Sequence, residues 1–300
     1  MPTCCPPRAR SLYQSKALSV HDYRCFAHKG GAGGEECANS ASIVFVRRGL
    51  FVRHVEGQTL AADANCVAFF SPGQTYRVSH PVEGGDDCTA FVPSPELLDE
   101  MLDFRGMRDC EGGFPSPQGE ISSHAYAAQR RLLRRLAAAD SAGAEIDEAA
   151  IALLDAVLLE QSRRNGRAAR GSSRRQSTIR AHRETVEYAK VYMAARSGER
   201  VTLDEVASAS HCSPYHLTRV FHEVTGAPVR RYLSRLRLRS ALDRIAQGER
   251  DITRIALDSG FFDHSHFTNA FRREFGAPPS AFRDAHDRRS LRQMSKNLQV

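Results

Sequence analysis

One pattern of residues occurs twice in the C-terminal part of the chain, about fifty positions apart. The first copy reads SPYHLTRVFHEVTGAP (Ser213 to Pro228) and the second reads DHSHFTNAFRREFGAP (Asp263 to Pro278). At an offset of 50 residues the copies share six identities within thirteen positions. Each copy follows a short apolar segment, TLDEVA before the first and DITRIALDSG before the second. Two helix-turn-helix units are the structure that this repeat predicts.

Capping residues mark the ends of the expected helices. Thr202 and Glu205 have the spacing of a capping box, in which each side chain accepts a hydrogen bond from the other residue's backbone N–H. Pro214 suits the first position of a helix, where its missing N–H costs nothing. We expect further helix starts to be capped by Ser213, Asp251 and Asp263, and helix ends by Gly226 and Gly276.

Helical periodicity separates a buried from an exposed face in the second helix of each unit. The buried stripes are expected to be Leu217, Val220, Phe221 and Val224 in the first unit, and Phe267, Ala270 and Phe271 in the second. The outward residues are then Tyr215, Thr218, Arg219 and His222 in the first unit, and Ser265, Thr268, Asn269 and Arg272 in the second. These outward faces are candidates for reading DNA.

The segment Pro228 to Gly248 reads as one long helix between the two units. Its apolar side is formed by Val229, Tyr232, Leu233, Leu236, Ala241, Leu242 and Ile245, and its other side carries Arg230, Arg231, Arg235 and Arg239. Two reading helices on one side of B-DNA enter successive major grooves about 34 Å apart. A rigid spacer helix would hold them at a fixed separation.

This layout resembles the DNA-binding domain of the AraC/XylS family of bacterial transcription regulators. The resemblance covers residues 180 to 286 and rests on LDEVA, SPYHLTRVF, RLRLRSA and ITRIALDSGFFDHSHFTNAFRREFGAPPSAFR, in that order. It implies binding to double-stranded promoter DNA and action on RNA polymerase. It also implies base-reading positions at Tyr215, His216, Thr218 and Arg219 in the first unit, and at His264, Ser265, Thr268 and Asn269 in the second.

The second unit departs from the family pattern at Asn269, which stands where an arginine is common. Asparagine pairs naturally with adenine in the major groove, whereas arginine pairs with guanine. Phosphate contacts are expected from five arginines: Arg230, Arg231, Arg235, Arg239 and Arg272.

Charge is divided unequally along the chain. Residues 163–300 carry 27 Lys and Arg against 14 Asp and Glu, whereas residues 1–162 carry 15 against 21. A basic domain attracts phosphate backbones of any sequence, and an acidic domain avoids them. DNA binding is therefore expected from the second half, with a merely solvated basic surface as the alternative.

Targeting signals and cysteine usage indicate a cytoplasmic protein. No apolar run approaches the roughly 18 residues that cross a membrane, and the N-terminus MPTCCPPRARSLY lacks the apolar core of a signal peptide. Eight cysteines are present without a C-x-x-C pair, so buried reduced thiols are expected. A thiol sensor using Cys25 and Cys37 is a second hypothesis.

Short apolar runs alternate with turn signals between residues 23 and 92. The runs SIVFVRRG, LFVRHVEG, QTLAAD, CVAFFSPG, TYRVSH and CTAFV read as antiparallel strands of a small barrel or sandwich. The turns at Arg48-Gly49, Glu56-Gly57 and Ser71-Pro72-Gly73 would place successive strands side by side. This rhythm, with FFSPG and GGDDCTAF, resembles the cupin-like sensing domain that precedes the DNA-binding domain in the same family.

A barrel of this size can hold one small effector, whose identity and binding residues the sequence leaves unknown. His54, His80 and Glu83 raise the alternative of a metal-dependent cupin enzyme, but the compact H-x-H arrangement with a downstream Glu is missing. The sequence also lacks a G-x-S-x-G elbow and a phosphate-binding glycine loop. We therefore expect no catalytic residues, no metal and no cofactor.

The sequence predicts an α+β protein of two domains, with a cupin-like antiparallel β-barrel, a helical hairpin and an all-α double helix-turn-helix domain. The expected divisions are a disordered start (1–20), a sensing domain (21–110), a hairpin (111–162), a basic linker (163–178), the DNA-binding domain (179–286) and a tail (287–300). Ser94 to Phe104 is a further helix. The hairpin, formed by residues 122–139 and 145–162, either packs on its own barrel or pairs two chains as a homodimer.

These features predict a sequence-specific DNA-binding transcription regulator. The resemblance implies that activation of transcription is the commoner outcome. A metal-dependent cupin enzyme fused to a DNA-binding module and a sequence-indifferent architectural DNA binder are the alternatives. Bound transition metal would favour the metal-dependent enzyme. Equal affinities for a specific site and for random DNA would favour the architectural binder.

Overall fold

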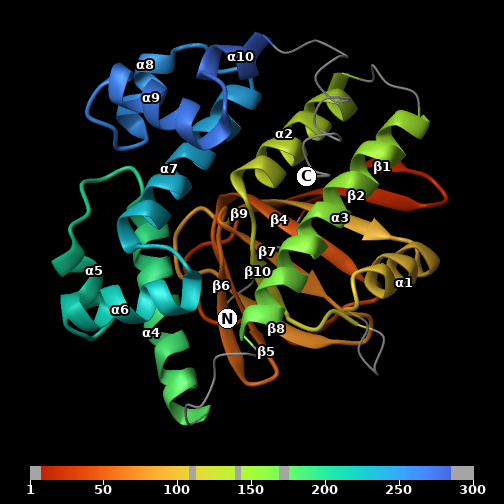
Figure 1. Cartoon of the computed structure of the whole chain (residues 1–300), viewed down its shortest axis with the longest axis horizontal. Coiled ribbons are helices and arrows are strands. Elements are labelled where there is room, and N and C mark those ends of the chain that lie inside the picture. The colour runs from red at the N-terminus through yellow and green to blue at the C-terminus, as the bar shows by residue number, and fades with distance from the viewer. Residues whose placement is uncertain (1–7, 108–112, 139–142, 169–175, 285–300) are drawn as a thin grey trace.

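The computed structural model describes residues 8–107, 113–138, 143–168 and 176–284. A sheet-rich N-terminal region is followed by helices, which gives an α+β chain with a C-terminal helical domain (Figure 1). The strands are β1 Arg8–Gln14, β2 Leu18–Cys25, β3 Glu36–Cys37, β4 Ser42–Gly49, β5 Phe51–Val55, β6 Gln58–Ala62, β7 Cys66–Phe70, β8 Thr75–Ser79, β9 Asp86–Pro93 and β10 Gln118–Glu120. Each apolar run that predicted a strand does form one.

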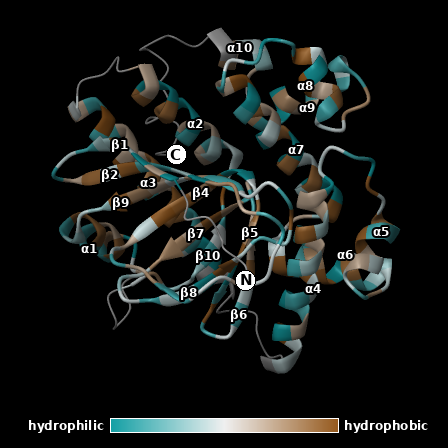
Figure 2. Ribbon diagram, turned by 180° about the vertical axis from the view of Figure 1, so that it is seen from behind, coloured by the Kyte–Doolittle hydropathy of each residue, from teal (hydrophilic) through white to brown (hydrophobic). Residues whose placement is uncertain are grey.

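The strands pair into two antiparallel sheets. One sheet has the order β1-β2-β9-β4-β7-β10 and the other β3-β8-β5-β6. Within the described residues no hydrogen-bonded ladder closes the two sheets into one barrel. Hydrophobic residues colour parts of the β2 and β9 ribbons brown in the larger sheet (Figure 2), and Val20, Ile43 and Phe91 are fully buried in its core.

Only one of the three predicted turns joins hydrogen-bonded neighbours. Glu56 and Gly57 both have positive φ, 51° and 69°, and connect the paired strands β5 and β6. Gly49 and Gly73 instead lead the chain from one sheet to the other, because β4 and β7 belong to the larger sheet and β5 and β8 to the smaller. The expectation that all three turns place strands side by side was wrong.

The expected disorder of residues 1–20 was wrong for the part that the structure describes. Arg8–Gln14 forms strand β1 and pairs with β2 from Arg8 opposite Arg24 to Gln14 opposite Ser19. Most side chains of β1 are exposed. Backbone hydrogen bonds to β2 hold this strand, and such bonds do not depend on apolar side chains. The sequence of β1 therefore has no apolar pattern that would predict a strand. Residues 1–7 lie outside the described residues.

Ten helices lie in the described residues. They are α1 Pro95–Phe104, α2 Ser123–Ala138, α3 Gly143–Ala168, α4 Gln176–Ala195, α5 Leu203–Ala209, α6 Pro214–Thr225, α7 Val229–Ala246, α8 Ile252–Asp258, α9 His264–Phe275 and α10 Pro279–Asp284. The predicted linker 163–178 is helical at both ends. Its first part extends α3, where arginine and alanine are good helix formers, and its last three residues begin α4. Its middle, 169–175, lies outside the described residues, as does the predicted tail.

The hairpin of α2 and α3 packs within its own chain. Leu132, Leu133, Leu154 and Leu158 are buried in the same core as the larger sheet. Helix α2 also contacts α7 and α9. The apolar surface that suggested a dimer interface is therefore largely covered by the same chain.

A buried polar contact joins the N-terminal region to α7. The Tyr232 hydroxyl donates to both carboxylate oxygens of Asp63, at 3.0 and 2.9 Å. The guanidinium of Arg239, which is 0% exposed, donates to the Ala64 carbonyl at 2.7 Å and to the Ile121 carbonyl at 2.8 Å. On the next turn of α7, Asp243 pairs with Arg130 of α2 at 2.6 Å. Buried polar side chains thus fix helix α7 to the N-terminal region.

Among the described residues, none of the helices combines the length and apolarity that a membrane crossing requires.

Arg239→Ala should lower the free energy of unfolding by about 3 kcal/mol or more, because it leaves buried carbonyls without donors at about 1–3 kcal/mol each. The matched control is Arg230→Ala on the exposed side of the same helix, which should stay within about 0.5 kcal/mol. Urea unfolding of the full-length protein measures both. Equal midpoints for the two variants would contradict the structural role of Arg239.

Candidate nucleic-acid interface

Each helix-turn-helix unit is built by the local signals that its sequence carries. The capping box of Thr202 and Glu205 begins α5, and Ser213 caps α6 with Pro214 in its first turn. Asp251 and Asp263 cap α8 and α9. Gly226 and Gly276 end α6 and α9 in the left-handed conformation, with φ of 69° and 75°. All the predicted caps are confirmed.

The buried stripes hold each unit together. Leu217, Val220 and Phe221 in the first unit, and Phe267 and Phe271 in the second, are 0% exposed. Val224 is 38% exposed, so its assignment to the stripe was wrong. Helix α4 braces the first unit, because it buries Val186, Ala189 and Met193 in one cluster with α5 and α6.

The outward face of α6 is open over two of its four candidate reading residues. Tyr215 is 80% exposed, and Arg219 is also exposed. The ring of His216 is half-buried and meets the His182 ring edge-on, with centroids 5.6 Å apart. The Thr218 hydroxyl donates to the Pro214 carbonyl of its own helix at 2.8 Å, although the side chain is exposed. Tyr215 and Arg219 are therefore the side chains of this set that are most available to DNA.

The outward face of α9 offers three of its four candidates. His264, Ser265 and Asn269 are exposed. Thr268 is half-buried, and its hydroxyl oxygen is enclosed by protein. Thr268 therefore lies poorly for contact with a base edge.

The five arginines expected to contact phosphate separate into two groups. Arg230, Arg231 and Arg272 are exposed. Arg235 is partly buried and pairs with Glu274 at 2.9 Å. Arg239 lies inside the protein, where burial lowers the pKa of its guanidinium. The assignment of Arg239 to phosphate was wrong, because the side of α7 that carries it faces the N-terminal region.

One arginine that the sequence did not single out connects the surroundings of both units. Arg237 donates to the Ser197 carbonyl, before α5, at 2.7 Å and to the Gly260 carbonyl, in the turn before α9, at 3.3 Å. Burial lowers the pKa of Arg237. The only sequence signal was its place within the spacer helix. Arg237 lies on α7, and its two contacts link the surroundings of the first unit to those of the second.

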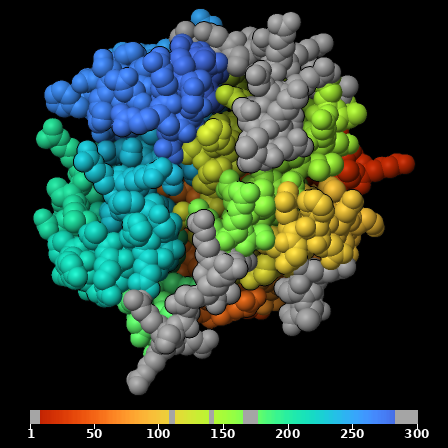
Figure 3. All heavy atoms as spheres, in the orientation of Figure 1, coloured from red at the N-terminus to blue at the C-terminus, as the bar shows by residue number. Residues whose placement is uncertain are grey.

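The two units form two lobes on one side of the molecule (Figure 3), and α7 runs between them (Figure 1). Both lobes are on the side away from α1 and the β-hairpin β1–β2. Because one helix carries both units, their outward faces are held at a set spacing. Binding to two successive major grooves would need a fixed spacing of this kind.

The N-terminal region contains a cavity of about 670 Å³ between the two sheets. Its walls include Phe51, Phe70 and Val78, together with Cys25 and Cys88. The three residues first weighed as metal ligands do not meet there. His54 contacts Ser79 at 2.9 Å, Glu83 contacts His28 at 2.6 Å on the surface, and only His80 lines the cavity.

The sequence is similar to those of known helix-turn-helix proteins. A family sequence model described as "Helix-turn-helix domain" matches residues 206–285. The HTH-type transcriptional activator RhaS of Escherichia fergusonii is 26% identical over 263 residues, which cover 86% of this chain and 90% of that protein. The bifunctional transcriptional activator/DNA repair enzyme AdaA of Bacillus subtilis is 29% identical over 100 residues, 33% of this chain and 47% of that protein. A solved transcriptional regulator from Chromobacterium violaceum, with an AraC-type DNA-binding domain, is 28% identical, with coverage of 34% of this chain and 90% of its own and a TM-score of 0.33.

Arg219→Ala should weaken binding to the selected DNA site by about 1–3 kcal/mol and relax sequence preference at one position, if its guanidinium reads a base. Arg230→Ala is the matched control, because an exposed arginine that anchors phosphate weakens every sequence alike and flattens the salt dependence. Gel-shift titrations on the selected site and on random DNA separate the two patterns. Equal losses on both DNAs for Arg219→Ala would exclude base reading.

Proposed function

Because the chain belongs to the AraC/XylS family of transcription regulators, we propose that it reads promoter DNA through two successive major grooves and regulates transcription in response to an effector. The observation that carries this proposal is the pair of similar units on one helix, each with an open outward face. A single chain then spans a long site without a partner. The two units differ in their exposed residues, so the two halves of the site should differ in sequence.

Base reading is assigned to the exposed polar side chains of α6 and α9. Arg219 has the donors to pair with the O6 and N7 atoms of guanine, and Asn269 can pair with adenine. Phosphate anchoring falls to Arg230, Arg231 and Arg272, which are exposed near the ends of the reading helices. The half-buried His216 and Thr268 support the shape of each helix more than they read bases.

Effector sensing is assigned to the cavity between the two sheets, in a domain that we take to be cupin-like. Its volume of about 670 Å³ falls in the range of small-molecule sites. An effector there can influence DNA binding only if it favours one arrangement of the domains. The contact of Asp63 with Tyr232 supports such a link, because it ties the β6–β7 connection to the spacer helix.

The sign of regulation follows from the relatives. RhaS and AdaA are both described as transcriptional activators, so we propose activation through contact with RNA polymerase. The proposed role involves no catalysis by this chain.

Selection of bound sequences from a random DNA pool tests the proposal. Two dissimilar half-sites are expected, with centres one helical turn, about 10 base pairs, apart. Transcription by purified RNA polymerase from a promoter with this site should rise when the protein is added. A pool that stays random after repeated selection would instead indicate an architectural DNA binder.

Asn269→Ala tests the second unit. If Asn269 pairs with adenine, the variant should lose about 1–3 kcal/mol of discrimination at one position in one half-site. The other half-site should keep its consensus, which serves as the internal control. The same selected consensus for wild type and variant would show that Asn269 does not specify sequence.

A further inference from the structure

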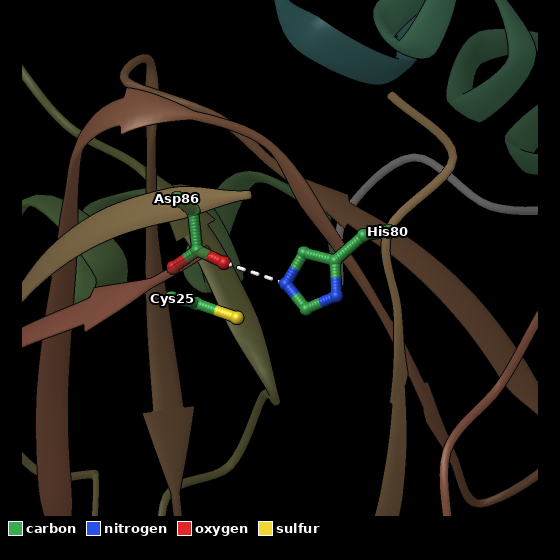
Figure 4. A group of neighbouring side chains, drawn as sticks. All are labelled: Cys25, His80 and Asp86. Carbon is green, nitrogen blue, oxygen red and sulfur yellow. Dashed lines mark hydrogen bonds and ion pairs between the residues drawn. The ribbon is translucent and has the colours of Figure 1, made fainter. Parts of the chain in front are cut away.

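Three side chains with metal-binding atoms meet at one end of the cavity between the sheets. Cys25 ends β2, Asp86 begins β9, and His80 follows β8. One ligand atom from each lies within 4.8 Å of the others. All three residues are buried. Figure 4 shows the Cys25 sulfur and the Asp86 carboxylate directed toward the His80 ring.

The backbone holds this group in place. Cys25 and Asp86 are directly opposite each other in the β2–β9 ladder. Gly85, with φ of 66°, lies so close to this strand that an added Cβ would stand 2.0 Å from the Cys25 carbonyl oxygen. His80 follows β8 of the smaller sheet and is held by an isolated backbone bridge to Gly30. The convergence therefore results from strand pairing and a glycine contact, which leave its side chains little freedom.

A hydrogen-bonded His–Asp pair is the simplest interpretation of this group. His80 Nε2 and Asp86 Oδ1 are 2.7 Å apart. The Cys25 sulfur belongs to the same group, because one ligand atom of each of the three residues lies within 4.8 Å of the others. The Cys88 thiol, which donates to Asp86 Oδ2 at 2.9 Å, adds a second sulfur to the same carboxylate. A buried group of sulfur, nitrogen and oxygen donors is what a thiophilic divalent ion prefers.

We propose that Cys25, His80 and Asp86 bind a divalent transition-metal ion of the Zn²⁺ class, and that this ion is an effector of the protein. Zn²⁺ sites with three protein ligands keep the fourth position open, and here the cavity borders the three ligands. The ion's effector role rests on the proposed DNA-binding function, whereas the metal site stands without it.

A chain of contacts leads from this site to the spacer helix. Strand β9 carries both Asp86 and Thr89, and the Thr89 hydroxyl accepts from Gln129 of α2 at 2.8 Å. The next residue of α2, Arg130, pairs with Asp243 of α7. Binding of an ion that shifts the start of β9 would thus act on α2 and on the helix that carries both DNA-reading units.

Titration of the full-length protein with Co²⁺ and Zn²⁺ tests the site. One Co²⁺ per chain should bind with a thiolate-to-cobalt charge-transfer band. Cys25→Ser should remove the band. Both Cys25→Ser and His80→Gln should weaken Zn²⁺ binding at least as much as loss of an outer-shell partner does, roughly 10- to 100-fold. Cys212→Ser, a half-buried cysteine of the DNA-binding half, should change neither. Circular dichroism verifies that each variant is folded.

Two results would overturn the metal site: no saturable one-to-one binding by folded wild type, or an unchanged band and Zn²⁺ affinity in folded Cys25→Ser. The effector role is measured as the change in affinity for the selected DNA site on adding Zn²⁺. A change of roughly 5- to 150-fold in wild type, absent in Cys25→Ser, supports it. Zn²⁺ binding without any change overturns the effector role alone. Wild type that binds no DNA sequence selectively, with or without Zn²⁺, contradicts the proposed function and leaves the metal result standing.

Discussion

The contact between α7 and the β6–β7 connection is the constraint on which the other parts of the structure depend. Buried polar groups favour hydrogen-bond partners. Here the Tyr232 hydroxyl donates to Asp63, and the Arg239 guanidinium donates to the Ala64 and Ile121 carbonyls. Hydrogen bonds are directional, so this contact fixes the orientation of α7 more closely than apolar packing alone. Both helix-turn-helix units are attached to that helix. Their placement relative to the sheets is therefore decided at a few buried side chains.

The contact between α7 and the β6–β7 connection also has a cost in free energy, because its charged groups lose hydration. Burial raises the pKa of Asp63, which means that the carboxylate loses hydration that its partners only partly replace. Burial likewise raises the pKa of Asp243, although Arg130 opposes the shift. Charged groups that give up water in this way contribute little net stability even when their geometry is good. A contact of this kind can separate at a smaller net cost than an apolar interface of equal area.

Local features of the fold could be predicted from the sequence, and long-range ones could not. The capping residues, strands β4 to β9 and the spacer helix follow from neighbouring residues, and the structure contains them. Strand β1 lies where the sequence predicted disorder. The sequence interpretation put Arg230 and Arg239 on one polar side of α7, but nine positions at about 3.6 residues per turn place them on opposite sides. Arg230 is exposed, and Arg239 is buried against the N-terminal region. Cys25, His80 and Asp86 come from three strand ends, so no local spacing indicates that they meet.

The arginines of the C-terminal half serve two purposes, and this changes what its positive charge implies. Arg235, Arg237 and Arg244 are engaged with Glu274, with backbone carbonyls, and with Glu249 and Asp258. Exposed arginines on and beside the reading helices, such as Arg219 and Arg272, remain turned to solvent. Each phosphate that a protein neutralises adds about −0.9 to the slope of the logarithm of the binding constant against the logarithm of the salt concentration. The net charge of the half overstates the number of phosphate contacts, because several of its arginines are engaged in contacts within and between the two units.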